Sequence, residues 1–326
     1  MEGRWTVPED KARSRLDLFL AAELPEHSRS QIQNWIRTGN VLVNGNSTKT
    51  GHLLRAGDEL VLHSPPEPPF LPEPEAIPLS VLYEDSDIAV IDKPAGLVCH
   101  AGAGRRSGTL VNALLHRWGG LNTGDSLRPG IVHRLDRGTS GVIVVARTAA
   151  ALRSLGRQFK DRTVKKEYLA LVHGKVAPRA GTIDAPLGRD PRNRKKISPR
   201  ARKQRTAVTR YETLESLGAF TLLKVRPETG RTHQIRVHLA ARGNPVVGDT
   251  LYGGARRLPP QIQSLIKGLD RFCLHASRIE FLHPSTGVGF SVTAELPPEL
   301  TLIIEALRGA ESGAIGMAPG RAPSSP

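Results

Sequence analysis

Residues 129–146 read PGIVHRLDRGTSGVIVVA, and they place a polar loop directly before an apolar strand. Residues 143–145 are all β-branched, which predicts a buried strand. In the loop, Asp136 lies between two arginines, a setting that keeps a carboxylate ionised and suits a nucleophile or an electrostatic stabiliser. Gly138 and Gly141 permit positive φ angles and a close approach of the backbone to a ligand. Taken alone, these residues are explained more simply by a surface ion pair that precedes a strand.

Short strands predominate on both sides of this segment. The patterns predict strands at 87–93, 143–145, 166–172, 208–214 and 219–225, and helices at 109–118, 149–159 and 234–241. Few of these strands are followed by a crossover helix, which argues against a doubly wound parallel sheet. The predicted fold class of residues 79–307 is therefore α+β, with a mixed, mainly antiparallel sheet.

Two shifts in composition set the expected domain boundaries. Residues 64–78 are rich in proline, which removes amide donors and fixes φ, so this stretch is predicted to be an extended linker. It separates a small module at 13–63 from the larger domain. Residues 308–326 consist largely of glycine, alanine, proline and serine without periodicity, and they are predicted to be a disordered tail.

The N-terminal module is predicted to contain two helices and a small hairpin. Apolar residues at helical spacing indicate helices at 15–24 and 30–38, and strands are expected at 41–45, which runs into an Asn-Gly turn, and at 59–63. Arg29 and Arg37 give the second helix a basic surface. The same features could simply build a small αβ fold.

This module resembles the S4-type RNA-binding domain. The resemblance rests on RLD at 15–17, SRSQI at 28–32, VLVNG at 41–45 and AGD at 56–58. It implies docking on structured RNA through phosphate contacts, with Arg29 and Arg37 as RNA-binding residues.

Composition and charge agree with a nucleic-acid partner. The 326 residues include 46 basic and 31 acidic ones, a formal net charge of +15, and such a charge points to a polyanion. Two cysteines exclude a disulfide framework and a multi-cysteine zinc site. Because there is no apolar run long enough for a membrane span and no signal-peptide pattern at residues 1–15, we expect a cytoplasmic protein without membrane contact.

The densest basic stretch is GRDPRNRKKISPRARKQR at 188–205. One interpretation is a solvated loop between strands. The other, which we favour, is an electrostatic arm that contacts RNA phosphates through Arg194, Lys195 and Lys196 and becomes ordered when RNA binds.

The segment HRLDRGTSG at 133–141 matches the signature H-R-L-D-x-x-T-S-G of the RluA-type RNA pseudouridine synthases. Further similarity follows in the same order, with DKPAG at 92–96, KKEYLAL at 165–171, TGRTHQIRVH at 229–238 and GDTLYG at 248–253. The resemblance covers about 13–305. It implies a monomeric enzyme that converts uridine to pseudouridine in structured RNA, with large-subunit (23S) ribosomal RNA or a ribosomal subunit precursor as the expected partner, and with no cofactor or metal.

The resemblance also assigns roles to individual residues. Asp136 corresponds to the catalytic aspartate, and Arg134 to the arginine that fills the gap left when the target nucleotide leaves the RNA. Tyr168 corresponds to the tyrosine that stacks on the target base. Arg231 corresponds to the arginine that pairs with the catalytic carboxylate.

Several alternatives remain open at this point. A non-catalytic RNA-binding factor is disfavoured by the intact set of Asp136, Tyr168 and Arg231, and a glycosidase-like hydrolase by the lack of a second carboxylate near Asp136 in sequence. Transfer RNA remains an alternative substrate. The carboxylate could attack C1′ or remove the C2′ proton to give a glycal, and either Ile235 or Val237 could pack beneath the uracil.

Overall fold

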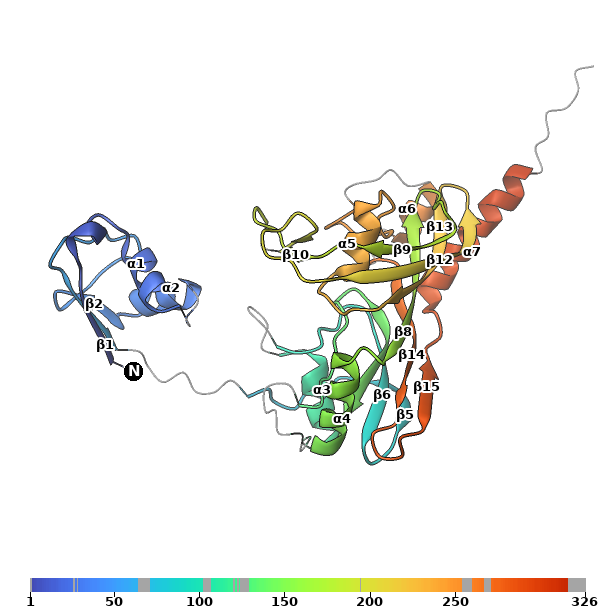
Figure 1. Ribbon diagram of the computed structural model, residues 1–326, viewed down its shortest axis with the longest axis horizontal. Coiled ribbons are helices and arrows are strands. Elements are labelled where there is room, and N and C mark those ends of the chain that lie inside the picture. Colours follow the sequence, from blue (N-terminus) through green and yellow to red (C-terminus); the bar gives the residue numbers. More distant parts are fainter. Residues whose placement is uncertain are drawn as a thin grey trace, which may run out of the picture. The chain divides into compact units, whose positions relative to one another are not determined.

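The computed structural model describes residues 2–25, 27, 29–63, 71–101, 107–119, 121, 123, 129–193, 195–253, 260–266 and 271–315. The chain divides into two compact units, 1–70 and 71–326 (Figure 1).

The first unit packs two helices on a four-stranded sheet of order β1-β4-β2-β3. Its elements are β1 (Glu2–Thr6), the 3₁₀ turn η1 (Glu9–Lys11), α1 (Leu16–Glu23), α2 (Arg29–Arg37), β2 (Val41–Val43), β3 (Asn46–Ser47) and β4 (Glu59–His63). The two predicted helices and the later strands are confirmed. Asn44 and Gly45 have φ angles of 49° and 76°, which an Asn-Gly hairpin turn requires. The compact unit extends beyond the predicted start at residue 13, because β1 pairs with β4 and completes the sheet.

The predicted linker at 64–78 is only partly a linker. Residues 64–70 lie outside the described part of the chain. Residues 71–78 have neither helix nor strand assigned, and they pack on the second unit. The amide of Glu75 donates to the Asn112 carbonyl at 3.0 Å, and its carboxylate accepts from the Gly108 amide at 2.9 Å. These hydrogen bonds assign the segment to the second unit.

The second unit is built on a nine-stranded sheet. The strand order is β5-β6-β7-β14-β8-β13-β12-β9, and β15 pairs with β14. The strands are β5 (Ser80–Glu84), β6 (Ile88–Lys93), β7 (Ser140–Ala146), β8 (Lys165–His173), β9 (Ala180–Asp184), β12 (Val208–Leu217), β13 (Phe220–Pro227), β14 (Leu274–Leu282) and β15 (Gly289–Thr293). Among the described pairs of this sheet, only β7 and β14 run parallel, which confirms the predicted mixed, mainly antiparallel α+β fold.

Helices cover both faces of this sheet. They are α3 (Leu110–Trp118), α4 (Ala149–Lys160), α5 (Gln234–Ala241), α6 (Pro260–Ile266) and α7 (Pro298–Ile315). In the half that contains β6 and β7, alternate strand residues pack on α4 and on α3. In the other half, β8 and β13 pack on α5 with one face and on α7 with the opposite face (Figure 1). Two covered faces explain why β7 is buried along its whole length.

The predicted disordered tail begins too early. Helix α7 continues to Ile315, so the prediction is wrong for residues 308–315, where alanine and glutamate favour a helix and carry it past Arg308. Residues 316–326 lie outside the described part.

Candidate active site

Asp136 lies in the loop that leads into β7, and neighbouring segments hold this loop in place. The Leu135 amide and carbonyl both hydrogen-bond to the Cys99 thiol, at 3.4 and 3.3 Å. The Gly96 amide donates to the Arg137 carbonyl at 2.7 Å. The backbone on both sides of Asp136 is therefore tied to Gly96 and Cys99, at and just after the DKPAG segment that carried part of the family resemblance.

Gly138 in this loop and Gly141 at the start of β7 are required for different reasons. Gly141 has a φ of 107°, and a Cβ there would lie 2.2 Å from the Ala276 carbonyl oxygen, where β7 meets β14. Gly138 does not need a positive φ. A Cβ on Gly138 would lie 2.8 Å from the ring of Phe272. Both positions serve close packing behind the loop, and Gly138 lets Phe272 approach the site.

Arg236 is the cation that pairs with Asp136. Its Nη1 donates to Asp136 Oδ2 at 2.9 Å, while Nε and Nη2 donate to the two carboxylate oxygens of Asp249 at 2.7 and 3.0 Å. The Asp136 side chain is 17% exposed and that of Asp249 is 1% exposed. One guanidinium therefore links a buried structural carboxylate to one that reaches the pocket.

The surroundings fix this guanidinium in orientation. Its carbon lies 4.1 Å from the ring centre of Phe272 and 5.1 Å from that of Tyr252. Burial disfavours its charge, but the hydrogen bonds and charges of Asp249 and Asp136 outweigh burial, so the pKa of Arg236 is raised. Asp136 thus faces a permanent positive charge that cannot swing away.

Asp136 pairs with Arg236 and not, as predicted, with Arg231. Arg231 Nε donates to the Thr206 carbonyl at 3.2 Å, and its backbone amide donates to the Gln234 side chain at 3.0 Å. Arg231 precedes α5, whereas Arg236 lies inside that helix, which begins after His233 in the left-handed conformation at a φ of 55°. This start to α5 places Arg236 rather than Arg231 against Asp136.

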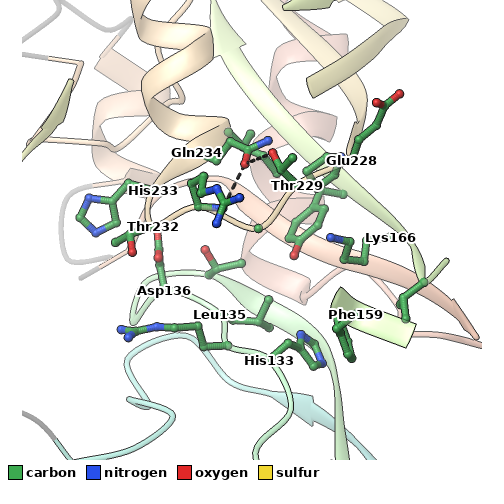
Figure 2. Close-up of a pocket in the computed structure, with 18 of the residues that line it drawn as sticks. His133, Leu135, Asp136, Phe159, Lys166, Glu228, Thr229, Thr232, His233 and Gln234 are labelled. Atoms are coloured by element: carbon green, nitrogen blue, oxygen red, sulfur yellow. Dashed lines mark hydrogen bonds between the residues drawn. The ribbon is translucent and has the colours of Figure 1, made fainter. Parts of the chain in front are cut away.

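A pocket of about 470 Å³ opens over Asp136 (Figure 2). Arg134, Asp136, Tyr168, Arg231 and Ile235 all line it, so the four residues predicted to act on the target nucleotide share one cavity. Val237 instead packs with Leu187 and Ala207 in a separate apolar cluster. Of the two apolar candidates, Ile235 is therefore the one at the pocket.

The electrostatics of the far wall differ from those around Asp136. Burial lowers the pKa of Lys166 to about 8. Burial and, to a smaller extent, the charge of Lys166 lower the pKa of His133 to about 3, and its Nε2 accepts the Val144 amide at 3.0 Å. Burial, aided by the charge of Asp136, raises the pKa of Tyr168. Tyr168 and His133 are therefore neutral groups in the wall of the pocket near pH 7.

The basic stretch at 188–205 contains a hairpin, so the prediction of a loop that orders only on binding is wrong for this part. Strands β10 (Gly188–Arg189) and β11 (Ile197–Ser198) pair with each other, and the Ile197 amide donates to the Tyr252 hydroxyl at 2.8 Å. Lys195 is exposed and Lys196 half-buried. Arg194 lies outside the described residues.

In the first unit, Asp17 organises the arginine predicted to bind RNA. Arg29 donates to Asp17 Oδ2 from Nε and Nη2, at 3.0 and 2.7 Å, and Arg15 and Gln33 also donate to this buried carboxylate. Burial opposes the charge of Asp17, but these hydrogen bonds outweigh it and lower its pKa to about 2. The Arg37 side chain donates to the Gln33 carbonyl at 3.2 Å. Both arginines of α2 are exposed.

His238, one of the two histidines spaced five apart at 233 and 238, is engaged in hydrogen bonds. His238 contacts Thr209 Oγ1 and the Ala185 carbonyl, both at 2.9 Å. Within the described ranges, no three histidine, cysteine, aspartate or glutamate side chains come together as a metal site would need. In the same ranges, no helix has both the length and the apolar character of a membrane span.

Comparison with known proteins identifies the family. A family model described as RNA pseudouridylate synthase matches residues 87–241, and an S4 domain model matches residues 14–60. A Xanthomonas campestris protein named ribosomal large subunit pseudouridine synthase D is 46% identical over 306 residues, which cover 93% of this chain and 91% of that protein. The chain belongs to the RNA pseudouridine synthase family. It is therefore an RNA-binding isomerase that forms pseudouridine.

Other RNA pseudouridine synthases agree with this assignment. The Pseudomonas aeruginosa ribosomal large subunit pseudouridine synthase D is 41% identical, and the match covers 95% of this chain and 97% of that protein. Among solved structures, human RNA pseudouridylate synthase domain containing 4 superposes with a TM-score of 0.54 at 27% identity, covering 70% of this chain and 93% of that chain. Its fold supports the nine-stranded sheet as that of a pseudouridine synthase.

Proposed function

We propose that this enzyme isomerises uridines of large-subunit (23S) ribosomal RNA to pseudouridine, that Asp136 carries out the chemistry, and that no cofactor takes part. The observation that carries the proposal is the Asp136–Arg236 ion pair at the base of the pocket that Tyr168 also lines. The names of the Xanthomonas and Pseudomonas relatives support ribosomal RNA as the substrate. We propose further that the enzyme acts in the cytoplasm and as a monomer.

The reaction rearranges one nucleoside without gain or loss of atoms. The bond between C1′ and N1 breaks, the uracil turns, and C5 forms a bond to C1′. C5 then loses its proton and N1 carries one, so the product is an isomer and no oxidant or group donor is required. In this scheme the Asp136 carboxylate attacks C1′ or removes the C2′ proton, and the hydrogen bond from Arg236 holds it in position.

The remaining pocket residues receive binding roles. The target base must leave its stack to reach Asp136, which costs a few kcal/mol. Arg134 is exposed at the rim of the pocket, where its planar guanidinium can stack in the gap left in the RNA. Tyr168 offers a ring face to the freed uracil, and Arg231 offers a charge to the RNA backbone.

The direct test is Asp136→Asn, which keeps the size of the side chain and removes its charge. We expect this variant to fold, to bind a ribosomal stem-loop in filter retention, and to release no tritium from C5-labelled uridine. Normal tritium release would refute the role of Asp136. Mapping pseudouridines in RNA from cells with and without the protein identifies the substrate, and sites lost from transfer RNA alone would refute the ribosomal assignment.

We assign target affinity to the first unit, which carries Arg29 and Arg37. Removal of residues 1–70, the whole of that unit, should weaken binding of the stem-loop and leave kcat at saturating RNA unchanged. A folded truncation without turnover would contradict this division of roles.

A further inference from the structure

Tyr252 connects the basic hairpin to the wall of the active site. Its hydroxyl accepts the Ile197 amide at 2.8 Å and lies 2.8 Å from Nδ1 of His233. Its position is fixed by Asp249, whose Oδ1 accepts the backbone amides of Leu251 and Tyr252 at 3.1 and 3.2 Å. The carboxylate that holds Arg236 therefore also holds the turn that carries Tyr252.

This arrangement favours one tautomer of His233. A backbone amide can only donate, so the phenol oxygen accepts the hydrogen bond from Ile197, and of the contacts of Tyr252 in the described part of the chain only His233 Nδ1 can accept the phenol proton. A histidine whose Nδ1 accepts carries its proton on Nε2. Burial lowers the pKa of His233, against a smaller opposing effect of the Asp136 charge, and this favours the neutral ring.

His233 lies beside the reacting carboxylate. It lines the pocket together with Asp136, and Asp136, Arg236, Asp249 and Arg134 are the charged groups that act on it. Figure 2 draws His233 and Asp136 on one side of the pocket, opposite Phe159 and Lys166. Throughout the described part of the chain, no group hydrogen-bonds to its Nε2.

We propose that His233 binds the target nucleotide by donating a hydrogen bond from Nε2 to an oxygen of the ribose–phosphate backbone, and that Tyr252 is the positioning residue that holds it in the required tautomer. This inference rests on the proposed function, in which Asp136 reacts at the ribose. A donor beside Asp136 and Arg134 then faces the sugar and its phosphates, whereas Tyr168 faces the base.

A neutral donor suits this position for an electrostatic reason. A second cation beside Asp136 would compete with Arg236 for the carboxylate and pull it out of line. A neutral imidazole provides an N–H without that competition. Because the Ile197 amide belongs to the hairpin that carries Lys195 and Lys196, the basic hairpin also completes this donor site.

The tautomer can be measured without any assay of activity. In protein with ¹⁵N-labelled histidine, the His233 signals are those absent from His233→Gln. We expect an unprotonated Nδ1 and a protonated Nε2 in the full chain at neutral pH, and a loss of this preference in Tyr252→Phe. A proton on Nδ1, or a charged ring at neutral pH, would overturn the proposal.

Kinetics on a ribosomal stem-loop test the contact itself. Asparagine places its side-chain amide near the position of Nδ1, and glutamine places it near that of Nε2. His233→Asn should therefore raise KM about tenfold or more, which is the effect of losing a hydrogen bond to a charged partner, with a smaller change in kcat. His233→Gln should recover most of that loss. His116→Asn, on the exposed side of α3, is the matched control and should match the unmodified enzyme.

The two proposals fail in different ways. If the unmodified enzyme forms no pseudouridine in ribosomal RNA, the proposed function fails. If it is active and His233→Asn has the same KM, or if glutamine and asparagine are equally impaired in variants that melt normally, the assignment of His233 fails while the proposed function stands.

Discussion

The same substitution should have different effects at the two carboxylates that share Arg236. At Asp249 it should mainly reduce stability, and at Asp136 it should mainly abolish activity. Asp249→Asn removes the charge from a side chain that is 1% exposed and accepts two hydrogen bonds from the guanidinium and two from the backbone. Asparagine keeps one acceptor oxygen but turns an amide toward an N–H of Arg236. We therefore expect a loss near the lower end of the range for breaking a buried ion pair, about 3 kcal/mol.

Asp136→Asn should cost far less stability. Asp136 accepts a single hydrogen bond from Arg236, is 17% exposed, and leaves Arg236 paired with Asp249 when it is neutralised. We expect the free energy of unfolding to fall by about 1 kcal/mol, the typical net contribution of one hydrogen bond. For a unit of this size, about 3 and about 1 kcal/mol correspond to falls in Tm of roughly 6–12 °C and 2–4 °C.

Calorimetric unfolding and tritium release together provide the assay. Asp161→Asn, an exposed carboxylate at the end of α4, serves as the control and should change stability by less than about 0.5 kcal/mol. Asp136→Asn should be stable and inactive, whereas Asp249→Asn should be unstable and retain some turnover at low temperature. Equal losses of Tm in the two variants would refute the argument that Asp249, and not Asp136, anchors Arg236.

Three further results follow from particular contacts. Arg236→Lys should lower turnover on the order of 100-fold without loss of RNA affinity, because an ammonium cannot hold both carboxylates. Arg231→Lys should instead mainly raise KM. Tritium release measured over a range of RNA concentrations distinguishes a change in kcat from a change in KM. Neutralising Lys195 and Lys196 together should reduce the slope of log Kd against log salt by about 1.5, as measured by filter binding. The pKa of Asp17 is about 2, below its value in the unfolded chain, so ionised Asp17 should contribute about 2 kcal/mol to the stability of the first unit above pH 4. This contribution should be lost between pH 4 and pH 2. Urea unfolding followed by Trp35 fluorescence measures it.

The sequence predicted the carboxylate that lies in the pocket but not its partner. HRLDRGTSG identifies Asp136 because the residues that surround it are contiguous in the chain. TGRTHQIRVH offers two arginines five positions apart, and the choice between them depends on the backbone of His233 and the start of α5. Asp249, Tyr252 and Phe272 were not assigned roles for the same reason. Their contacts with Arg236 join segments distant in sequence, although GDTLYG did mark two of them as part of a family motif.

The elements that were missed lack a local pattern. β1 is short and largely polar, and its role becomes clear only through its pairing with β4, more than fifty residues later. β14 carries an irregularity between Ala276 and Arg278, which interrupts the alternation by which a strand is recognised. In contrast, β7, α4 and β8 satisfy simple periodicity, and their predicted positions are confirmed within a few residues.

The position of β14 sets the order in which the enzyme can be assembled during its synthesis. This strand pairs with β7 on one side and β8 on the other, yet its residues, Leu274–Leu282, are translated more than a hundred positions after both partners. Asp136 emerges first, Arg236 later, and Phe272 and β14 almost last. Such long-range strand insertion makes folding slow, because the chain must close large loops before the central contacts form. A partly translated chain can therefore hold RNA through its finished first unit long before it possesses a site that can alter a uridine.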